Sequence, residues 1–290
     1  MKITIADILK KYASRIDRLD LELLIAYILK KPREFVLTHP EYELSPLKIK
    51  NLELKITRRQ REEPLAYILG FREFFGLPFL VSPATLIPRP ETELMVEEAL
   101  AEVESLKSKV ESIIDIGTGS GNIIISIAKN LNTDLKFFAI DISAEALRIA
   151  KRNAKKNNVA GKIKFLRGNL LEPFIKNSKL EIRNSRTIVL ANLPYLSREI
   201  YNATLPTVKK YEPKSALYSP KEGLAHYEEL FQQIKTLQKA ICSSHVTCYA
   251  EISPEQKAPM RKLIRRYFSG AKLEFRKDLA GKWRLAIITL

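Results

Sequence analysis

Three glycines and a carboxylate stand at a spacing suited to holding a nucleoside. In the segment "DIGTGSGN", Gly117, Gly119 and Gly121 lie between a predicted strand and a predicted helix. Glycine lets the backbone turn sharply and approach a ligand closely, and the start of the helix offers free N–H groups. Asp141 follows Gly121 by 20 residues and ends the next predicted strand, where a carboxylate can accept hydrogen bonds from both hydroxyls of a ribose. The pair predicts a nucleoside-containing ligand, and the alternative is a glycine turn that binds nothing.

The spacing of these glycines separates two classes of cofactor. A dinucleotide fingerprint, G-x-G-x-x-G, needs glycine at the position of Asn122. This chain has G-x-G-x-G instead, with Asp115 at the end of the strand. That variant resembles the first motif of S-adenosylmethionine-dependent methyltransferases, which implies S-adenosylmethionine as the cofactor.

A second polar segment, "NLPY" at Asn192–Tyr195, directly follows the apolar run "TIVLA". Because ligands of a doubly wound sheet lie beyond the carboxyl ends of its strands, this turn is expected to face the cofactor. The Asn192 side-chain oxygen and the Leu193 backbone carbonyl can each accept a hydrogen bond from a planar NH2 group. Pro194 is expected to hold that carbonyl toward the pocket, and Tyr195 offers its ring to a flat acceptor.

Such a turn suits methyl transfer to an amide or an aromatic amine. The nitrogen lone pair of these groups is delocalised, and full deprotonation is not available near neutral pH. Two acceptors that hold both N–H groups orient the lone pair toward the methyl group, so positioning and aimed dipoles provide most of the acceleration. An ordinary Asn-X-Pro turn is the alternative, and the order of glycine loop, Asp141 and turn along the chain favours the catalytic interpretation.

The elements that position these residues begin with a helical part. Apolar residues recur at intervals of three and four in residues 5–16 and 19–31, which predicts two amphipathic helices. A third helix is predicted with Ser45 as its N-cap and Pro46 at its first position. Residues 1–72 are therefore expected to form a helical domain.

A predicted hairpin at residues 73–84 leads into residues 85–290, where strands alternate with helices. Such alternation implies βαβ units and a mainly parallel sheet with helices on both faces, so the expected fold class is α/β. The strand order is not determined by the pattern. The predicted strands are "SIIDIG", "KFFAID", "KIKFLRG", "TIVLAN", "VTCYAEIS" and two within "KLEFRKDLAGKWRLAIITL".

The composition excludes several classes of protein. Of the 290 residues, 46% are hydrophobic and 28% are charged, as in soluble globular proteins. No run approaches the roughly 20 apolar residues that span a bilayer. Cys242 and Cys248 make no disulfide framework, so a reducing cytoplasm is expected. The histidines His39, His226 and His245 lack metal-ligand spacing, so no metal site is predicted.

The net charge of +16 favours a polyanionic partner such as RNA, because Lys and Arg gain by releasing counterions from phosphates. The positive residues are spread along the whole chain, however, as a bias in composition would produce without any binding face. We therefore expect contact with RNA to be weak.

Nearly the whole chain resembles the release factor glutamine methyltransferases of bacteria, the PrmC or HemK family. The run "LIPRPETE", Leu86–Glu93, is the most specific marker, because other methyltransferases do not share it. A Pro-initiated helix start with Pro90 at N1 is the alternative, and it does not account for the length of the run. The other matching segments are "EPLAYILGFREFFGLPFLVSPAT", "IIDIGTGSGNIIISIA", "AIDISAEALRIAKRNAKKN", "LANLPY", "YEPKSALYSPKEGLAHYEEL" and "KDLAGKWRLAII".

This resemblance implies a helical substrate-recognition domain at residues 1–72 and a Rossmann-like, seven-stranded, S-adenosylmethionine-dependent methyltransferase domain at residues 85–290. The implied enzyme is a protein-(glutamine-N5) methyltransferase. Its implied substrate is the side-chain amide nitrogen of the glutamine in the Gly-Gly-Gln motif of class I peptide-chain release factors, so that it supports translation termination. A cytoplasmic monomer without membrane attachment is also implied.

Site residues follow from the same resemblance. The implied cofactor contacts are Gly117, Thr118, Gly119, Ser120, Gly121, Asp141, Asn169, Leu170 and Asn192. The implied catalytic and substrate-binding turn is Asn192, Leu193, Pro194 and Tyr195. Arg89 in "PRP" is a further substrate-binding candidate, and the alternative is a surface residue held by Glu91 or Glu93.

Two positions depart from the family. Leu193 stands where the family usually has proline, and it can supply the main-chain carbonyl with less rigidity. Asn169 stands where many methyltransferases have an Asp near the adenine amino group. Its amide oxygen can still accept a hydrogen bond, so weaker cofactor binding is expected, and an ordinary Asn at a strand end is the alternative.

The main rival is an rRNA adenine N6-methyltransferase, because Asn-Leu-Pro-Tyr is also the form found in rRNA adenine dimethyltransferases. The same two acceptors would serve the exocyclic amine of adenine, with Tyr195 stacking on the base. That family has its glycine loop nearer the N-terminus and its helical domain after the catalytic one, whereas here the helical domain comes first. A third hypothesis is a cofactor fold without activity that binds the ribosome or tRNA, and the intact Asn192, Tyr195 and Asp141 argue against it.

Overall fold

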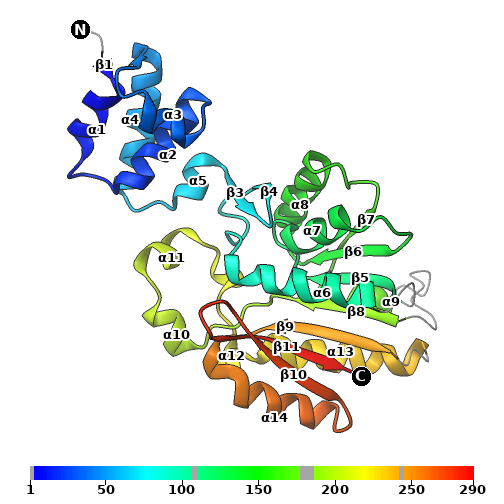
Figure 1. Cartoon of the computed structure of the whole chain (residues 1–290). Coiled ribbons are helices and arrows are strands. Elements are labelled where there is room, and N and C mark those ends of the chain that lie inside the picture. The colour runs from blue at the N-terminus through cyan, green and yellow to red at the C-terminus, as the bar shows by residue number, and fades with distance from the viewer. Residues whose placement is uncertain (1–2, 106–109, 177–185, 242–244) are drawn as a thin grey trace. The chain divides into compact units, whose positions relative to one another are not determined.

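The computed structural model of the chain describes residues 3–105, 110–176, 186–241 and 245–290 (Figure 1). Its contacts divide the chain into two compact units. The first consists of Met1–Phe71 and Pro206–Tyr211, and the second of Arg72–Leu205 and Glu212–Leu290.

The first unit is a small helical bundle with its own core. Its helices are α1 (Ile5–Tyr12), α2 (Arg18–Leu29), α3 (Arg33–Thr38), α4 (Pro46–Gln60), α5 (Leu65–Leu69) and α11 (Pro206–Tyr211), and β1 (Ile3–Thr4) pairs with β2 (Glu43–Leu44). One face of α2 buries Leu24 and Ile25 against Leu52 and Ile56 of α4, as the apolar periodicity predicts. Helix α11 comes from a distant part of the sequence, and Tyr211 Oη donates to the Arg61 carbonyl oxygen at 2.7 Å.

A two-stranded sheet follows α5, formed by β3 (Phe71–Phe74) and β4 (Leu77–Leu80). Phe74 and Phe79 are buried, and their rings meet edge to face with centroids 6.1 Å apart. Both rings belong to a core cluster of the second unit, so burial of aromatic area holds this hairpin in place.

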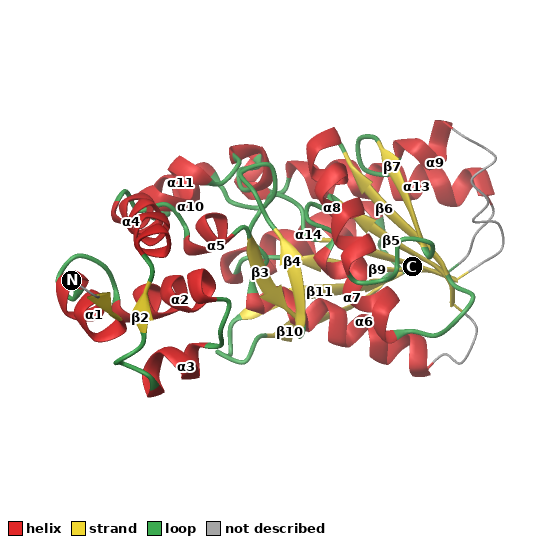
Figure 2. Ribbon diagram, turned by 90° about the horizontal axis from the view of Figure 1, so that it is seen from above, coloured by secondary structure: helices red, strands yellow, loops and turns green. Residues whose placement is uncertain are grey.

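The second unit is built on one seven-stranded sheet, which confirms the predicted Rossmann-like α/β fold. The strand order is β10-β11-β9-β8-β5-β6-β7. Strands β5 to β9 are parallel, and β11 runs antiparallel to both of its neighbours. The strands are β5 (Val110–Ile116), β6 (Lys136–Asp141), β7 (Ile163–Arg167), β8 (Arg186–Ala191), β9 (Val246–Glu251), β10 (Lys272–Lys277) and β11 (Trp283–Thr289). Figure 2 draws the strands in yellow.

Helices cover both faces of this sheet, because successive strand residues point to opposite sides. Ile113 belongs to the core under α6 (Glu93–Ser105), α7 (Asn122–Asn130) and α8 (Ala144–Lys156). Its neighbour Ile114 belongs to the core under α9 (Glu172–Lys176), α13 (Ala225–Ile241) and α14 (Lys257–Tyr267). The remaining short helices are α10 (Arg198–Ala203), α12 (Pro220–Gly223) and the 3-10 turns Pro90–Thr92, Lys214–Ala216 and Pro254–Gln256.

The strand order places a topological switch between β5 and β8. From β5 the chain proceeds to β6 and β7 on one side, and it then returns to form β8 and β9 on the other. Ligands of such sheets bind at the switch, beyond the carboxyl ends of the strands. The glycine loop follows β5, Asp141 ends β6 and the Asn192–Tyr195 turn follows β8, so all three meet at this edge.

The described residues can be examined for membrane-spanning helices, clustered metal ligands and free cysteines. No helix in the described residues is long and apolar enough to cross a membrane, and those residues contain no group of three or more potential metal ligands. Cys248 is a buried free thiol in β9, and Cys242 lies outside the described residues.

Candidate active site

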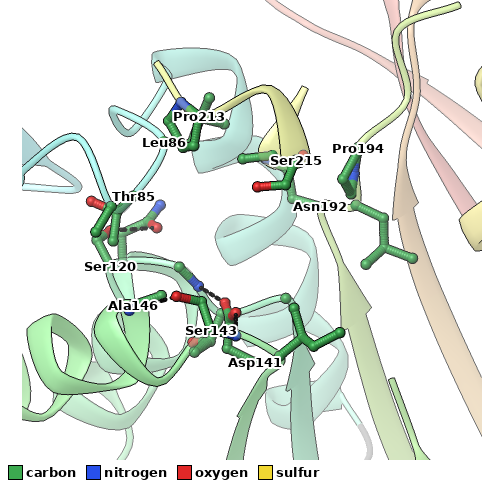
Figure 3. Close-up of a pocket in the computed structure, with 18 of the residues that line it drawn as sticks. Thr85, Leu86, Ser120, Asp141, Ser143, Ala146, Asn192, Pro194, Pro213 and Ser215 are labelled. Carbon is green, nitrogen blue, oxygen red and sulfur yellow. Dashed lines mark hydrogen bonds between the residues drawn. The ribbon is translucent and has the colours of Figure 1, made fainter. Parts of the chain in front are cut away.

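A pocket of about 520 Å³ opens at the switch point, entirely within the second unit. Its volume is in the range of small-molecule sites. Figure 3 shows Asp141 and Asn192 on its wall. The predicted site residues that line it are Arg89, Gly117, Thr118, Gly119, Ser120, Asp141, Asn169, Leu170, Asn192, Leu193 and Pro194. Gly121 and Tyr195 are not among the lining residues.

The glycine loop is tied to the strands on both sides of it. Thr118 N donates to the Ile140 carbonyl oxygen at 2.9 Å, and Gly119 N donates to Asp141 Oδ2 at 2.9 Å. Gly121 is the N-cap of α7, and a Cβ there would lie 2.7 Å from Ile125 Cδ1. Glycine at 121 is therefore required by the close packing against Ile125 of α7. Glycine at 119 places no side chain on the pocket wall.

Asp141 is held by the backbone and still has capacity to accept. Its Oδ1 accepts from Ser143 N at 2.8 Å and its Oδ2 from Gly119 N. Burial raises the pKa of this carboxyl, and the backbone N–H groups oppose the shift. An ionised carboxylate has about four lone-pair sites, so Asp141 can still accept from ligand hydroxyls.

Asp115 lies buried beneath the loop, at the end of β5. Thr118 Oγ1 donates to its Oδ2 at 2.6 Å, and its Oδ1 has no hydrogen-bond partner among the described residues. Burial raises the pKa of Asp115 to about 7, against the hydrogen bond from Thr118. Near neutral pH, this carboxyl is therefore divided between its acid and its ionised form.

The pKa of Asp115 predicts a dependence of stability on pH. Its value rises from 3.8 to about 7 on folding, so its stabilising contribution is complete below 3.8 and is lost as the pH rises through about 7. Asp115→Asn keeps the shape of the side chain and cannot ionise. The free energy of unfolding of this variant relative to wild type should therefore increase between about pH 4 and about pH 8. Urea denaturation at several pH values measures this, and a difference that does not vary with pH would contradict it.

The Asn192 amide is oriented by a residue from the "LIPRPETE" run. Nδ2 donates to Thr92 Oγ1 at 3.1 Å, and Thr92 is buried. Because the two polar atoms of an amide point in different directions, Oδ1 is directed away from Thr92. The atom of Asn192 that can accept a hydrogen bond is thus available to a ligand in the pocket.

The rest of the turn packs around this amide. Leu193 is buried, and its Cδ2 lies 3.2 Å from the position of a Cβ on Gly117, so it packs directly over the glycine loop. Tyr195 Oη donates to Glu251 Oε1 at 3.2 Å. Burial raises the pKa of Tyr195, and its hydroxyl is therefore a neutral donor. The turn's aromatic residue is thus bound to the end of β9, outside the pocket lining.

Arg89 pairs with a residue that sequence analysis missed. Its Nη2 donates to Glu212 Oε1, and the other oxygen of Glu212 accepts from Ile87 N at 3.2 Å. Glu212 is buried. The partner is therefore Glu212, whereas the sequence alternative named Glu91 or Glu93. Arg89 also lines the pocket.

At the other end of the pocket, Asn169 Nδ2 donates to Glu229 Oε1 at 2.5 Å, which leaves Asn169 Oδ1 directed away from Glu229. His226 lies one turn before Glu229 on α13 and also lines the pocket. Its Nδ1 shares a hydrogen bond of 2.8 Å with Ser219 Oγ. Burial lowers the pKa of His226, so its imidazole is neutral near pH 7.

Sequence analysis missed Thr92, Glu212, Glu229 and Glu251, which hold the candidate side chains in place. Glu251 is the last residue of β9 and lies near the end of the predicted strand "VTCYAEIS", so its position near a carboxyl end is the signal that could have identified it. The other three reach the site through tertiary contacts between distant segments.

Comparison with known proteins identifies the class of this fold. Residues 107–266 match the family described as "Methyltransferase domain", and residues 4–70 match the "PrmC N-terminal domain". The second unit is therefore a methyltransferase domain, consistent with its glycine loop and strand order. The hMettl16 catalytic domain, solved in complex with MAT2A 3'UTR hairpin 6, is similar with a TM-score of 0.54, 18% identity and coverage of 91% of each chain, and this likeness concerns the fold alone.

Sequence relatives narrow the class to one family. The release factor glutamine methyltransferase of Dictyoglomus turgidum is 34% identical over 92% of this chain and 89% of its own. That of Bacillus subtilis is 34% identical over 91% of this chain and 88% of its own. The chain belongs to the release factor glutamine methyltransferase family.

Proposed function

We propose that the protein transfers a methyl group from S-adenosylmethionine to the side-chain amide nitrogen of a glutamine in peptide-chain release factors, at their Gly-Gly-Gln motif. The observation that carries this proposal is the orientation of Asn192. Its Nδ2 is engaged by Thr92, so its Oδ1 can accept from an NH2 group in the pocket that Asp141 also lines. The relatives named release factor glutamine methyltransferase support the choice of acceptor.

The residues present fit S-adenosylmethionine. A Cβ on Gly119 would meet only the Gly117 carbonyl oxygen, at 3.9 Å, so its absence leaves room at the pocket wall. Asp141 has lone pairs for ribose hydroxyls, and Asn169 Oδ1 can accept from the adenine amino group. When bound, the cofactor supplies the electrophilic methyl group.

The chain's own contribution is to orient the acceptor. Asn192 Oδ1 and the Leu193 carbonyl accept the two N–H groups of the glutamine amide, which turns the nitrogen lone pair toward the methyl group. As the new C–N bond forms, positive charge develops on this nitrogen and strengthens both hydrogen bonds. The N-methylated amide then releases one proton to water, because a protonated amide is a strong acid.

We assign recognition of the release factor to the helical residues 1–72, as in the domain division expected from sequence. We infer a cytoplasmic location from the same proposal, because release factors act in the cytoplasm, and a monomer because the family resemblance implies one. The charge of +16 then adds only weak, salt-sensitive association with RNA.

The test is methyl transfer from labelled cofactor to three acceptors. These are a purified class I release factor, the same factor with its Gly-Gly-Gln glutamine replaced by alanine, and ribosomal RNA. We expect label in the first acceptor only. Label in the RNA would establish the adenine methyltransferase instead, and label in the alanine-substituted factor would show that another residue is the acceptor.

Replacing Asp141 should affect the cofactor first. Asp141→Ala removes the carboxylate that accepts from the ribose hydroxyls; two such bonds, at about 1.5–3 kcal/mol each, correspond to a fall in cofactor affinity of about 100- to 10,000-fold. Asp134→Ala is the matched control, because Asp134 is exposed and lies outside this pocket. Calorimetric titration measures both, and equal affinities for the two variants would remove Asp141 from the cofactor site.

A further inference from the structure

We propose that three cations on α14 and on the hairpin of β10 and β11 form a docking surface for an acidic segment of the release factor. These cations are Lys257, Arg261 and Lys277, and they are called the basic cluster below (Figure 1). This inference rests on the proposed function, because it names a second contact, besides residues 1–72, with the protein that carries the acceptor glutamine. The whole basic cluster belongs to the second unit.

Two aromatic rings hold the basic cluster in place. Trp283 begins β11 and Phe275 lies in β10, and their rings meet edge to face with centroids 6.4 Å apart. Lys257 Nζ lies 3.2 Å from the centre of the Trp283 ring, and Lys277 Nζ lies 4.8 Å from it. Lys257 Nζ and the Arg261 guanidinium carbon each lie 5.6 Å from the centre of the Phe275 ring. Because the faces of aromatic rings attract cations, these contacts keep the three charges together at the surface.

The basic cluster lacks a carboxylate of its own, because none of its members forms an ion pair within the described residues. The acidic residues of the hairpin have other partners: Glu274 pairs with Arg276 at 2.9 Å, and Asp278 with Arg284 at 2.8 Å. Burial lowers the pKa of Lys257, and the charges of the other two members lower it further. An anion supplied by a partner would therefore stabilise this group of like charges.

The basic cluster lies at the edge of the sheet that carries the pocket. Ala191 is the last residue of β8 to pair with β9, and Leu285 of β11 pairs with the last residue of β9. Asn192 follows the first of these residues, and Trp283 precedes the second by two positions. Trp283 and Asn192 therefore lie at the same edge, two strands or about 10 Å apart across the sheet.

The chain also joins the basic cluster to the Asn192–Tyr195 turn. Lys257 directly follows Gln256, and Gln256 Nε2 donates to the Tyr195 carbonyl oxygen at 2.7 Å. A protein that presents its glutamine to Asn192 must cover the surface around this turn. A distance of about 10 Å corresponds to about three residues of extended chain, so the segment next to the glutamine can reach the basic cluster.

The side chains of this surface fit a protein partner rather than RNA. Lys257 Nζ covers the Trp283 ring, so a base cannot stack on that face, whereas bases of single-stranded RNA stack on open aromatic rings. Leu279 is fully exposed in the turn between β10 and β11, two residues after Lys277. Interfaces between proteins combine apolar side chains with aromatic residues and Arg. The uncompensated positive charge then selects an acidic segment of that protein.

The test compares two double variants that lose the same number of positive charges. Lys257→Gln combined with Lys277→Gln, the cluster variant, neutralises two members of the basic cluster. Lys262→Gln combined with Lys272→Gln is the matched control, because these exposed lysines lie on the same two elements, α14 and β10, and are not members of the cluster.

Affinity for a purified class I release factor is measured by calorimetric titration. We expect it to fall about 3- to 30-fold in the cluster variant, the scale of losing two exposed charge pairs, and to keep its wild-type value in the control. Equal affinities of the two double variants would overturn the proposal. A loss of affinity for ribosomal RNA in the cluster variant alone, with release factor affinity retained, would also overturn it and assign the cluster to RNA.

Methyl transfer to the same release factor separates this proposal from the proposed function. If the wild type binds the factor without methylating it and the cluster variant binds it more weakly, the proposed function fails and the docking surface is supported. If the cluster variant binds and methylates the factor as the wild type does, only the docking surface fails.

A second measurement uses no release factor. Trp283 is the only tryptophan of the chain, so tryptophan fluorescence reports on the basic cluster. Titration with poly-L-glutamate should change this fluorescence in the wild type and in the control, with a midpoint about 3- to 30-fold higher in the cluster variant. An unchanged fluorescence in the wild type, or one midpoint shared by all three proteins, would overturn the proposal.

Discussion

Replacing Asn192 with alanine is expected to lower the rate of methyl transfer at least about a hundredfold, the scale of losing one aimed dipole at a reacting centre. The substrate nitrogen would keep the Leu193 carbonyl as one acceptor and would lose the other. Its lone pair would then no longer be directed at the methyl group. Cofactor affinity should change little, because Asp141 and the glycine loop provide the cofactor contacts. Single-turnover transfer and calorimetric titration measure the two quantities separately.

Asn130→Ala is the control for this change. Asn130 also donates through Nδ2, to the Ser126 carbonyl oxygen at 2.9 Å, but it is exposed at the end of α7 and does not line the pocket. Its variant should transfer methyl groups at the wild-type rate. Turnover by Asn192→Ala within a factor of about 10 of this control would assign the main role to other residues.

Gly223→Ala should displace the Asn192–Tyr195 turn of the site. A Cβ at Gly223 would overlap the Tyr195 carbonyl oxygen and Gln256 Nε2, and it would lie 2.8 Å from the Tyr195 carbonyl carbon. Gln256 Nε2 donates to that carbonyl at 2.7 Å and to Glu222 O at 2.9 Å, so neither neighbour is free to move. Lys221 and Glu222 also have left-handed φ values of 53° and 57°, which restricts the segment further.

We expect two measurable consequences of Gly223→Ala. Overpacking of this kind costs about 1–3 kcal/mol or more in addition to the backbone strain, and this should appear in the free energy of unfolding. A shift of the Asn192–Tyr195 turn by about 1 Å should lower turnover about a hundredfold even where the protein remains folded.

Gly281→Ala separates the effect of steric overlap from the effect of the left-handed backbone conformation. Gly281 has a φ of 74°, close to the 82° of Gly223, but a Cβ there meets no atom within 4 Å. This variant carries only the cost of the left-handed backbone, about 1–2 kcal/mol, and should keep full activity. If both variants showed the same stability and turnover, contact with Tyr195 would not be what requires glycine at 223.

Much of the fold was predictable because it depends on local pattern. The continuous apolar run in "KFFAID" predicts a buried strand, and β6 spans Lys136–Asp141. The start of α4 after Ser45, with Pro46 first, is also as predicted, although the Ser45 side chain makes no capping hydrogen bond. The two strands predicted within "KLEFRKDLAGKWRLAIITL" correspond to β10 and β11, which pair antiparallel.

The candidate site was predictable to the extent that its residues lie at strand ends. Asp141 and Asn192 line one pocket because parallel strands bring their carboxyl ends to one edge. The partners of these residues were not predictable in the same way. Arg89 and Glu212 are 123 residues apart, and Asn192 and Thr92 are 100 residues apart.

The sequence by itself determined the local properties of this protein: which segments are strands or helices, which loop is rich in glycine, and which polar residues follow a strand. The periodicity of side chains and the backbone freedom of each residue type are sufficient for these properties. Only the tertiary structure decided the strand order, and with it the placing of Glu251 beside Asn192, the pairing of Arg89 with Glu212 and the contact of Gly223 with Tyr195. Those contacts join segments that are distant along the chain, and their formation depends on how the two faces of the sheet are packed.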